Sequence, residues 1–495
     1  MADSSIFPEA LSRRLARASA IGRLYGASAS LVAAELSRTL DGPLVVIAHD
    51  PRHADRLEAE IRWFAGDDQP LTHFVEWETL PYDSFSPHQD IVSRRLEALA
   101  ALPNLKNGVI IVSAPALLQR LPPPAYVQAR TLDLAAGQTL ERQAFVDSLT
   151  AAGYARVPQV EVHGEFAVRG SLIDVYPMGS AQPVRIDFFD DEIESLRLFD
   201  PDTQLSGDAE DRIRLLPARE VPLDAEDVRY FRSRYRERFE GRPSRSRVYR
   251  EVSDGIAPGG IEYFLPLFFE STAAFEDYLP GNAVVFAPPD LEAILAAAWQ
   301  EIGERYELYR VDPERPLLPP DEAFHTPAAT LASLAALRRI EYRSQSLTES
   351  GGAVNLSTRM LPPVKLEARY EDPARALVEF LDRFDGRVLF TAESPGRREH
   401  LHELLGGRRL EPARSAGWRA FVSGDERLGV AVSPVEDGVI LEDCRLAIVG
   451  EQQLYGEKAK SRSRRRRALR DPETIIRQLN DLETGSPVVH EQYGV

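Results

Sequence analysis

Short apolar runs, each followed by a helical segment, most constrain the fold of this chain. Residues 42–50, GPLVVIAHD, and 108–113, GVIIVS, are apolar without alternation, and the amphipathic segment RHADRLEAEIRWFA (52–65) lies between them. Strands that are apolar on both faces are typical of parallel sheets covered by helices on both sides. Residues 1–124 therefore predict the first part of a parallel α/β domain, and residues 114–121 are expected to continue as a helix.

A second region, residues 125–217, has a different pattern. GEFAVRGSLIDVYPMG (164–179) and QPVRIDFFDDEIESLRLFD (182–200) alternate polar and apolar residues and are joined by a turn rich in Pro, Gly and Ser. Alternation with a period of two indicates antiparallel strands with one buried face. We expect a small antiparallel β-rich domain that interrupts the first domain, which resumes with helices over residues 218–345.

A further α/β domain is expected over residues 352–456. DPARALVEFLDRF (372–384) has helical spacing, and GRVLFTAES (386–394) predicts a strand. Residues 457–485 are expected to form a basic and then helical linker. Residues 486–495 are expected to begin a new strand, without a terminal tail, so we expect a longer protein that has been truncated within its next domain. The overall prediction is a multidomain α/β protein.

Composition and charge exclude several classes of site. Cys444 is the only cysteine, which excludes disulfides within the chain and thiolate zinc sites. The nine histidines do not cluster, and His400 and His402 point to opposite sides of a helix. No metal site is predicted. The net charge of −18 argues against nucleic acid wrapping over the whole surface. With no signal peptide and no apolar span of about 20 residues, we expect a cytoplasmic protein.

The segment YGASASLVAAEL (25–36) lies where a phosphate-binding loop would precede a helix. Such a loop needs glycines, so that backbone N–H groups can surround the phosphates, and a lysine that neutralises them. Ser28 stands where the last glycine belongs, Ala29 replaces the lysine, and no Gly-Lys dipeptide occurs in the chain. We therefore expect Gly26, Ser28, Ala29 and Ser30 to form a non-functional relic of a nucleotide loop, and we predict no catalytic residue.

The stretch RIDFFDDE (185–192) could end the metal-binding strand of an ATPase or form an exposed sheet face. A central parallel strand would be continuously apolar, but here the polarity alternates. Val184, Ile186 and Phe188 are expected on one face, and Arg185, Asp187 and Phe189 on the other. The three acidic residues 190–192 are expected in a solvated turn, which excludes a magnesium site.

Phe189 is an aromatic residue on the polar face of this strand. Arginine together with an aromatic residue is typical of interface hot spots. The alternative is that Phe189 packs under the next strand or against a neighbouring domain. Both interpretations remain open from the sequence.

Two other segments also allow more than one interpretation. The aromatic loop WETLPYDSFSPHQD (77–90) could be a functional loop or a packed cap over the sheet edge. The basic run KAKSRSRRRR could be a linker with incidental phosphate affinity, which we prefer, a DNA-backbone contact, or a protein-docking segment. Its cationic residues are Lys458, Lys460, Arg462, Arg464, Arg465, Arg466 and Arg467.

Four segments of the chain together resemble bacterial transcription-repair coupling factors. They are the loop 77–90, the block HGEFAVRGSLIDVYPMGSAQPVRIDFFDDEIESLRLFD (163–200), GGIEYFLPLFF (259–269) and GSPVVHEQYGV (485–495). The first α/β domain and its insertion are also similar, less closely, to the excision-repair protein UvrB. The resemblance implies a degenerate helicase-like domain interrupted by a UvrA-binding domain, a third domain, a linker and the start of an RNA polymerase-interacting domain.

The resemblance also implies which residues contact UvrA. Arg169, Arg185 and Phe189 match positions that the family uses against UvrA, and Asp187 and Phe188 match neighbouring contact positions of UvrB. Phe188 is expected to point inward and to support the others. Replacing Arg185 or Phe189 by alanine is expected to weaken UvrA binding without unfolding the protein.

The function implied is recruitment of UvrA to RNA polymerase stalled at DNA lesions, in transcription-coupled nucleotide excision repair. The chain itself is then a protein-interaction module without enzymatic activity or cofactor. ATP, magnesium, double-stranded DNA and polymerase release belong to motor and polymerase-binding domains absent from this sequence, and no membrane is involved. The alternatives are a nucleotide-hydrolysing helicase subunit and a UvrB-like DNA-binding protein that uses residues 458–467.

Overall fold

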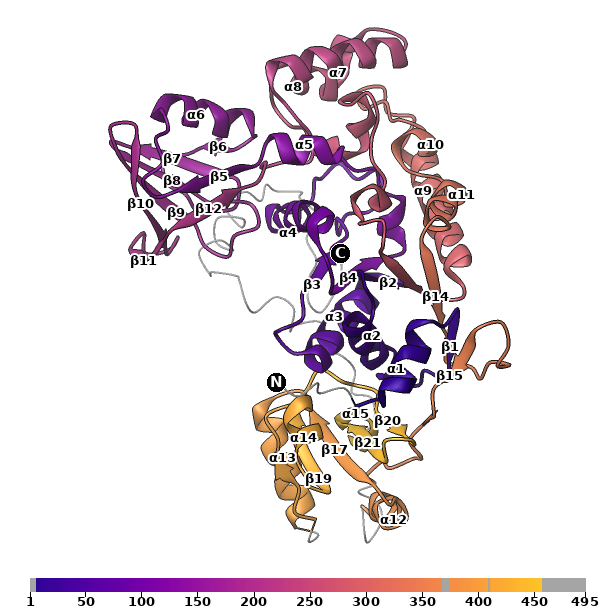
Figure 1. The fold of residues 1–495 in the computed structure, drawn as a ribbon. Helices are drawn as coiled ribbons and strands as arrows, with labels where there is room; N and C mark the ends of the chain where they lie inside the picture. Colours follow the sequence, from indigo (N-terminus) through magenta and orange to yellow (C-terminus); the bar gives the residue numbers. More distant parts are fainter. Residues whose placement is uncertain (1–5, 367–373, 408–409, 456–495) are drawn as a thin grey trace, which may run out of the picture. The chain divides into compact units, whose positions relative to one another are not determined.

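The structure is a computed structural model that describes residues 6–366, 374–407 and 410–455 (Figure 1). The chain divides into two compact units. The first comprises residues 1–361 and 385–450, and the second comprises residues 362–384 and 451–495. The described helices of the second unit are α12 (Arg375–Arg383) and α15 (Glu451–Tyr455), and within this unit the Leu366 N–H donates to the carbonyl of Leu454 at 2.7 Å.

A seven-stranded sheet forms the core of the first unit (Figure 1). All of its neighbouring strands are parallel, which confirms the sequence prediction for this region. Three strands beyond the β-rich insertion, β13, β14 and β15, join the same sheet, and β13 lies beside β2. The order is β15 (Ala353–Asn355), β1 (Ala20–Gly22), β14 (Arg338–Tyr342), β13 (Val284–Ala287), β2 (Leu44–Ala48), β4 (Val109–Ser113) and β3 (Leu71–Phe74).

Helices cover both faces of this sheet because its central strands are apolar on both sides. Along β2, Val45 and Ile47 belong to one apolar core, whereas Leu44 and Val46 belong to a second core on the opposite face. The helices are α1 (Glu9–Ala16), α2 (Ser28–Thr39), α3 (Pro51–Ala65), α4 (Gln89–Ala101), α5 (Pro124–Ala129), α7 (Ala225–Arg238), α8 (Arg247–Ser253), α9 (Leu291–Tyr309), α10 (Pro320–Ala323) and α11 (Pro327–Leu334).

Two details differ from the sequence prediction. The helix expected over 114–121 is only a short 3₁₀ helix, Pro115–Leu118. Beyond it Gln119 and Leu121 form antiparallel bridges to Phe324 and Ala273, so pairing with distant backbone replaces the helix. The sequence also did not predict the short strand Ala353–Asn355, which pairs with β1 and places Val354 in the core of the first sheet.

The β-rich region contains a six-stranded sheet of order β11-β10-β9-β8-β7-β6. Its pairs are antiparallel except β6 with β7, as the alternation predicted. A two-stranded sheet pairs β5 (Leu132–Ala135) with β12 (Arg212–Leu215). The remaining elements are α6 (Arg142–Ala151), β6 (Ala155–Arg156), β7 (Glu165–Arg169), β8 (Leu172–Val175), β9 (Val184–Phe189), β10 (Glu192–Phe199) and β11 (Ser206–Glu210).

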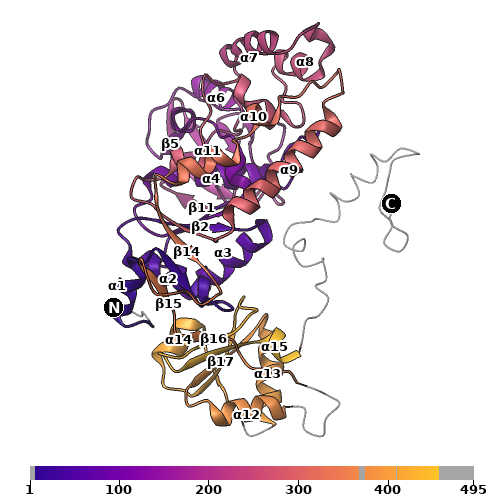
Figure 2. The ribbon, with the colours of Figure 1, turned by 90° about the vertical axis from the view of Figure 1, so that its right-hand side faces the viewer.

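A fourth sheet is mixed and has the order β16-β20-β21-β17-β19-β18, with helix α13 packed against β17 and β19 (Figure 2). The strand predicted over 386–394 is present as β17, and the helix predicted over 372–384 is present as α12. The elements are β16 (Thr358–Arg359), β17 (Arg387–Ala392), α13 (Pro395–Gly406), β18 (Ala413–Arg414), α14 (Trp418–Ser423), β19 (Leu428–Val432), β20 (Val439–Leu441) and β21 (Leu446–Gly450). The predicted domain boundaries remain predictions.

Candidate functional site

Helix α6 covers one face of the six-stranded sheet (Figure 1). Phe145 and Leu149 of α6 share an apolar core with Ile186 and Phe188 of β9, and the Phe145 and Phe188 rings lie 6.1 Å apart. Phe188 is 4% exposed, so it points inward as predicted. The other side chains of β9 therefore point to the opposite face of the sheet, away from α6.

The register between strands decides which side chains share that face. Arg169 on β7 pairs with Leu172 on β8, and Leu172 pairs with Asp187 on β9. Residues directly opposite one another in a ladder point to the same side of the sheet. Because side chains along β9 alternate between the two faces, Arg185 and Phe189 lie on the same side as Asp187. We call this side the outer face; the residues considered on it are Arg169, Leu172, Arg185, Asp187 and Phe189.

Phe189 is the exposed aromatic residue of the outer face. It ends β9, is 70% exposed, and is paired across the strand with Glu192. The interpretation that it packs under a neighbouring strand or domain is therefore wrong. Glu192 is the first residue of β10, so the turn of this hairpin holds Asp190 and Asp191 and not the whole acidic triplet.

Arg185 is largely engaged within its own domain. Its Nε and Nη2 donate to the two carboxylate oxygens of Asp174 at 2.7 and 2.9 Å, and its Nη1 donates to Ser206 Oγ at 3.0 Å. The guanidinium also lies 4.9 Å from the ring centre of Phe199. The Arg185 side chain is 17% exposed and Asp174 is 1% exposed. Arg185 therefore neutralises a buried carboxylate. The sequence-based expectation that Arg185→Ala leaves folding unaffected is revised accordingly, because removing Arg185 leaves the Asp174 charge buried.

Asp187 and Arg169, the other polar residues of the outer face, make fewer contacts within the domain than Arg185 does. Asp187 is half-buried and accepts a hydrogen bond from Ser171 Oγ at 3.0 Å. Arg169 is exposed and donates from Nη2 to the carbonyl of Pro158 at 3.0 Å. The face therefore presents a cation, an anion and an exposed aromatic ring, a combination suited to recognising another protein.

Sequence reasoning did not single out Asp174. The residue lies between Ile173 and Val175 in an otherwise apolar strand, and a polar residue in that position signals a buried partner. The partner follows only from the pairing of Asp174 with Arg185 across β8 and β9.

The relic of the nucleotide loop is filled by the chain itself. The Ala27 N–H donates to the carbonyl of Asp437 at 2.9 Å, and Gly26, at φ +52°, leaves no room for a Cβ because the Gly438 carbonyl would lie 2.3 Å away. Backbone amides that would face a phosphate in a functional loop thus face a backbone carbonyl.

The side chains that follow this loop point into the protein. Ser28 Oγ donates to the carbonyl of Tyr25 at 2.6 Å, and Ser30 Oγ donates to Glu60 Oε2 at 2.5 Å. Burial raises the pKa of Glu60 to about 7. Ala29 supplies no cation at the position of the lysine.

The aromatic loop 77–90 combines a packed and an exposed part. Trp77 and Tyr82 are buried, and the Tyr82 hydroxyl donates to the carbonyl of Leu318 at 2.9 Å. Phe85 is 72% exposed. The packed interpretation of this loop therefore holds for its aromatic anchors and not for Phe85.

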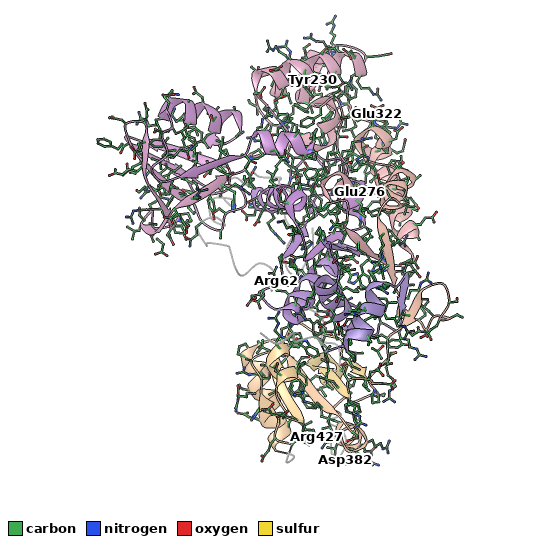
Figure 3. All side chains as sticks on the ribbon, in the orientation of Figure 1. Arg62, Tyr230, Glu276, Glu322, Asp382 and Arg427 are labelled. Atoms are coloured by element: carbon green, nitrogen blue, oxygen red, sulfur yellow. The ribbon has the colours of Figure 1, made fainter. Side chains whose placement is uncertain are left out.

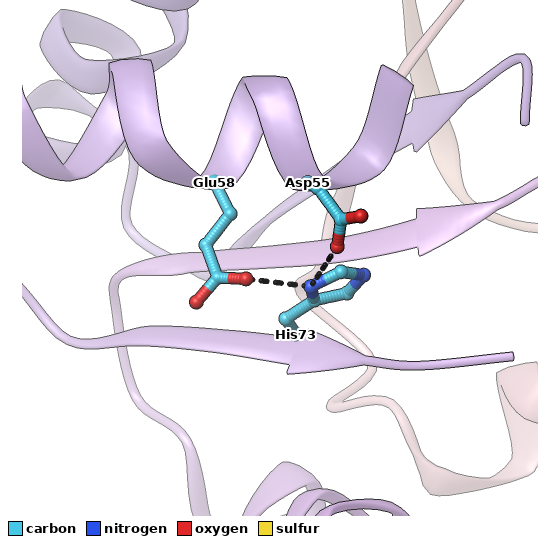
Figure 4. Close-up of side chains that lie close together, drawn as sticks. All are labelled: Asp55, Glu58 and His73. Atoms are coloured by element: carbon cyan, nitrogen blue, oxygen red, sulfur yellow. Dashed lines mark hydrogen bonds and ion pairs between the residues drawn. The ribbon is translucent and has the colours of Figure 1, made fainter. Parts of the chain in front are cut away.

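One cluster of potential metal ligands was not foreseen from the sequence. Asp55 and Glu58, three residues apart on α3, point toward His73 of β3 (Figure 4), with ligand atoms within 4.8 Å of one another. His73 Nδ1 lies 2.7 Å from Glu58 Oε2. Two arginines also lie near this carboxylate: Arg62, labelled in Figure 3, at 3.1 Å and Arg94 at 3.7 Å. The hydrogen bond from His73 lowers the pKa of Glu58 to about 2. With two arginines already at Glu58, the arrangement is that of an ion-pair network.

Other predicted features can be located only in part. His400 and His402 lie on α13. The basic run 458–467, the linker 457–485 and the segment 486–495 lie outside the described residues. Within the described residues, no helix is long and apolar enough to cross a membrane.

Comparison with known proteins identifies two domains. Residues 132–221 match the family model of the UvrB interaction domain, which begins at β5 and so includes the outer face. Residues 380–454 match the D3 domain of Mfd. The fold and this face thus define a multidomain α/β protein with a UvrB-type interaction domain.

Relatives over nearly the whole chain make the assignment more specific. A transcription-repair-coupling factor of Escherichia coli K12 is 40% identical over 476 residues, one of Haemophilus influenzae is 39% identical over 477 residues, and one of Myxococcus xanthus is 29% identical over 518 residues. These alignments cover 95–96% of this chain but 41% of each relative. The chain belongs to the family of transcription-repair coupling factors and corresponds to an N-terminal portion of its members.

Proposed function

We propose that this chain is the part of a transcription-repair coupling factor that recruits UvrA, and that UvrA docks on the outer face. The match to a UvrB interaction domain supports a protein-binding role for this region. The observation that carries the proposal is Phe189, a 70% exposed phenylalanine on the same face as Arg169 and Asp187. Large aromatic side chains with neighbouring arginines dominate the energy of protein interfaces.

The residues of the outer face would act unequally. Phe189 and Arg169 are the exposed contacts, and Asp187 lies beside them. Arg185, whose guanidinium is held by Asp174, would present only its remaining exposed edge. Phe188 would act from within the core by holding β9 in place.

We infer that the complete protein couples this recruitment to lesion-stalled RNA polymerase in nucleotide excision repair. In this proposal ATP-driven translocation on double-stranded DNA and polymerase release belong to the part of the relatives that this chain does not cover. In this proposal the protein acts in the bacterial cytoplasm. The proposed domains are a helicase-like domain over 1–124 and 218–345, the UvrA-binding domain over 125–217, and a third domain over 352–456. A basic linker over 457–485 and the start of a polymerase-interacting domain at 486–495 follow.

We also propose that the chain alone neither binds nor hydrolyses ATP and needs no cofactor. The absence of a Gly-Lys dipeptide and the bond from Ala27 to Asp437 support this. Titration with a fluorescent ATP analogue in the presence of magnesium is expected to give no saturable signal. Saturable binding that is lost on changing the loop at Gly26 would instead support a helicase subunit.

Calorimetric titration of UvrA with the wild-type chain and with Phe189→Ala tests the docking proposal. Loss of a hot-spot side chain costs about 2 kcal/mol or more, which weakens Kd about 30-fold. Phe85→Ala is the matched control, because Phe85 is 72% exposed but lies on another domain. The proposal fails if Phe189→Ala binds UvrA as tightly as wild type, or if both variants lose affinity equally.

A further inference from the structure

Helices α7 and α8 carry a local excess of positive charge in a chain of net charge −18. Residues 225–251 contain nine arginines and five acidic residues, a net charge of +4. Tyr230, labelled in Figure 3, marks the position of α7. The arginines are Arg229, Arg232, Arg234, Arg236, Arg238, Arg242, Arg245, Arg247 and Arg250. Such a local concentration of positive charge raises the electrostatic potential around these helices and attracts anions.

Three of these arginines share one side of α7 and have no acidic partner. Arg229, Arg232 and Arg236 are spaced by three and four residues, which places them on one helical face. Among the described residues no carboxylate lies within 4.0 Å of their guanidinium nitrogens, whereas Arg238 pairs with Glu322 at 2.6 Å. The three residues are called here the α7 arginine face.

Tyr249 of α8 holds two residues of the α7 arginine face in place. The guanidiniums of Arg232 and Arg236 lie 5.9 and 5.6 Å from the Tyr249 ring centre, and Arg232 Nε donates to the Tyr249 hydroxyl at 3.3 Å. Tyr249 is itself buried beside Phe231. Cation–π contacts with a fixed ring limit the freedom of both side chains, so less entropy is lost when they bind an anion.

A groove of about 340 Å³ opens between these side chains. It is lined by Arg229, Arg232, Ser233, Arg236 and Glu237. Glu237 is the single carboxylate of the lining and accepts a hydrogen bond from Ser233 Oγ at 3.2 Å. No apolar side chain lines this groove, so it offers nothing to anchor the hydrophobic residues on which peptide binding depends.

We propose that the α7 arginine face binds the phosphate backbone of duplex DNA, at a site separate from the outer face. Arg229 and Arg236 are seven residues apart, which corresponds to a rise of about 10 Å along the helix. Each DNA strand carries one phosphate per about 3.4 Å of axis, so the face spans about three phosphates. Arginine suits this role because its planar fork binds phosphate oxygens in pairs. The contact is with the backbone only and is independent of base sequence.

Fluorescence anisotropy with a fluorescein-labelled 25-base-pair duplex tests this proposal on the full chain. Because residues 458–467 are also basic, every protein is compared in two backgrounds, with that run intact and with its lysines and arginines replaced by glutamine. In the second background, binding through three phosphates predicts an affinity that falls about 40-fold between 50 and 200 mM salt. In Arg229→Gln/Arg236→Gln the remaining affinity is lower, and the same salt change weakens it only about 4-fold.

The control Arg52→Gln/Arg156→Gln removes the same charge from two exposed arginines elsewhere and is expected to bind DNA like its parent. Thermal melting checks that all variants fold. The UvrA affinity of Arg229→Gln/Arg236→Gln is expected to equal that of the wild type, which separates this DNA site from the proposed UvrA-docking face. The proposal is wrong if Arg229→Gln/Arg236→Gln binds DNA like the control in both backgrounds, or if substituting 458–467 alone abolishes binding. A polyglutamate peptide that displaces DNA at equal charge concentration would assign the face to an acidic protein instead.

Discussion

Replacing Arg185 by alanine is expected to destabilise the β-rich domain, whatever its effect on a partner. The substitution leaves Asp174, which is 1% exposed, without the two hydrogen bonds at 2.7 and 2.9 Å that now neutralise it. Removing one partner of a buried ion pair costs about 3–5 kcal/mol because the remaining charge stays buried. For a domain of about 90 residues, each kcal/mol lowers Tm by about 4–8 °C, so a fall of at least about 12 °C is expected.

Differential scanning calorimetry and urea denaturation of the full chain measure this loss. Arg197→Ala is the matched control, because Arg197 pairs with Arg185 across β9 and β10 but is exposed, and a change within about 0.5 kcal/mol is expected. The double variant Asp174→Ala/Arg185→Ala removes both charges and should be more stable than Arg185→Ala alone. The reasoning is refuted if Arg185→Ala is as stable as Arg197→Ala, or if the double variant is the least stable of the three.

Three further outcomes follow from the structure. Burial raises the pKa of Glu276 to about 7, so the folded protein binds more protons than the unfolded chain between pH 4.5 and 7. The free energy of unfolding should therefore fall as the pH rises from 4.5 to 7, by at most about 3 kcal/mol from this group. Urea denaturation should show that the free energy of unfolding of Glu276→Gln depends less on pH than that of the wild type. Gly26→Ala places a Cβ 2.3 Å from a carbonyl at a φ of +52° and should cost about 1–3 kcal/mol by the same assay, whereas Gly281→Ala, with open space around it, should be neutral. His73 holds the pKa of Glu58 at about 2, so the stability that Glu58 contributes is complete above pH 4.5 and is lost as the pH falls toward 2. In His73→Ala, an NMR titration should show the pKa of Glu58 moving up toward 4.5. An unchanged pKa would contradict the hydrogen bond from His73 as the cause of the shift.

The features that the sequence predicted correctly depend on local geometry. The alternation of β9 placed Phe188 inside and Phe189 outside because successive side chains of a strand point to opposite faces wherever the strand lies. The unbroken apolar runs at β2 and β4 likewise required burial on both sides and therefore a parallel sheet. In each case the information is contained in a few consecutive residues.

The features that were missed depend on contacts between distant segments. The sequence shows that Ala29 replaces a lysine, but the carbonyl that occupies the loop comes from Asp437, about 400 residues further along the chain. Arg185 could be assigned to the outer face, but its engagement by Asp174 depends on the register between β8 and β9. The helix expected after β4 was lost for the same reason, since Gln119 and its neighbours pair with distant backbone.

Site-specific photocrosslinking tests most directly the claim that UvrA closes over the outer face. A benzoylphenylalanine introduced at position 189 is expected to crosslink to UvrA in the mixed proteins, while the same group at position 85, equally exposed on another domain, is expected not to. Crosslinking from position 85 with none from position 189 would contradict the account, as would equal yields from both positions.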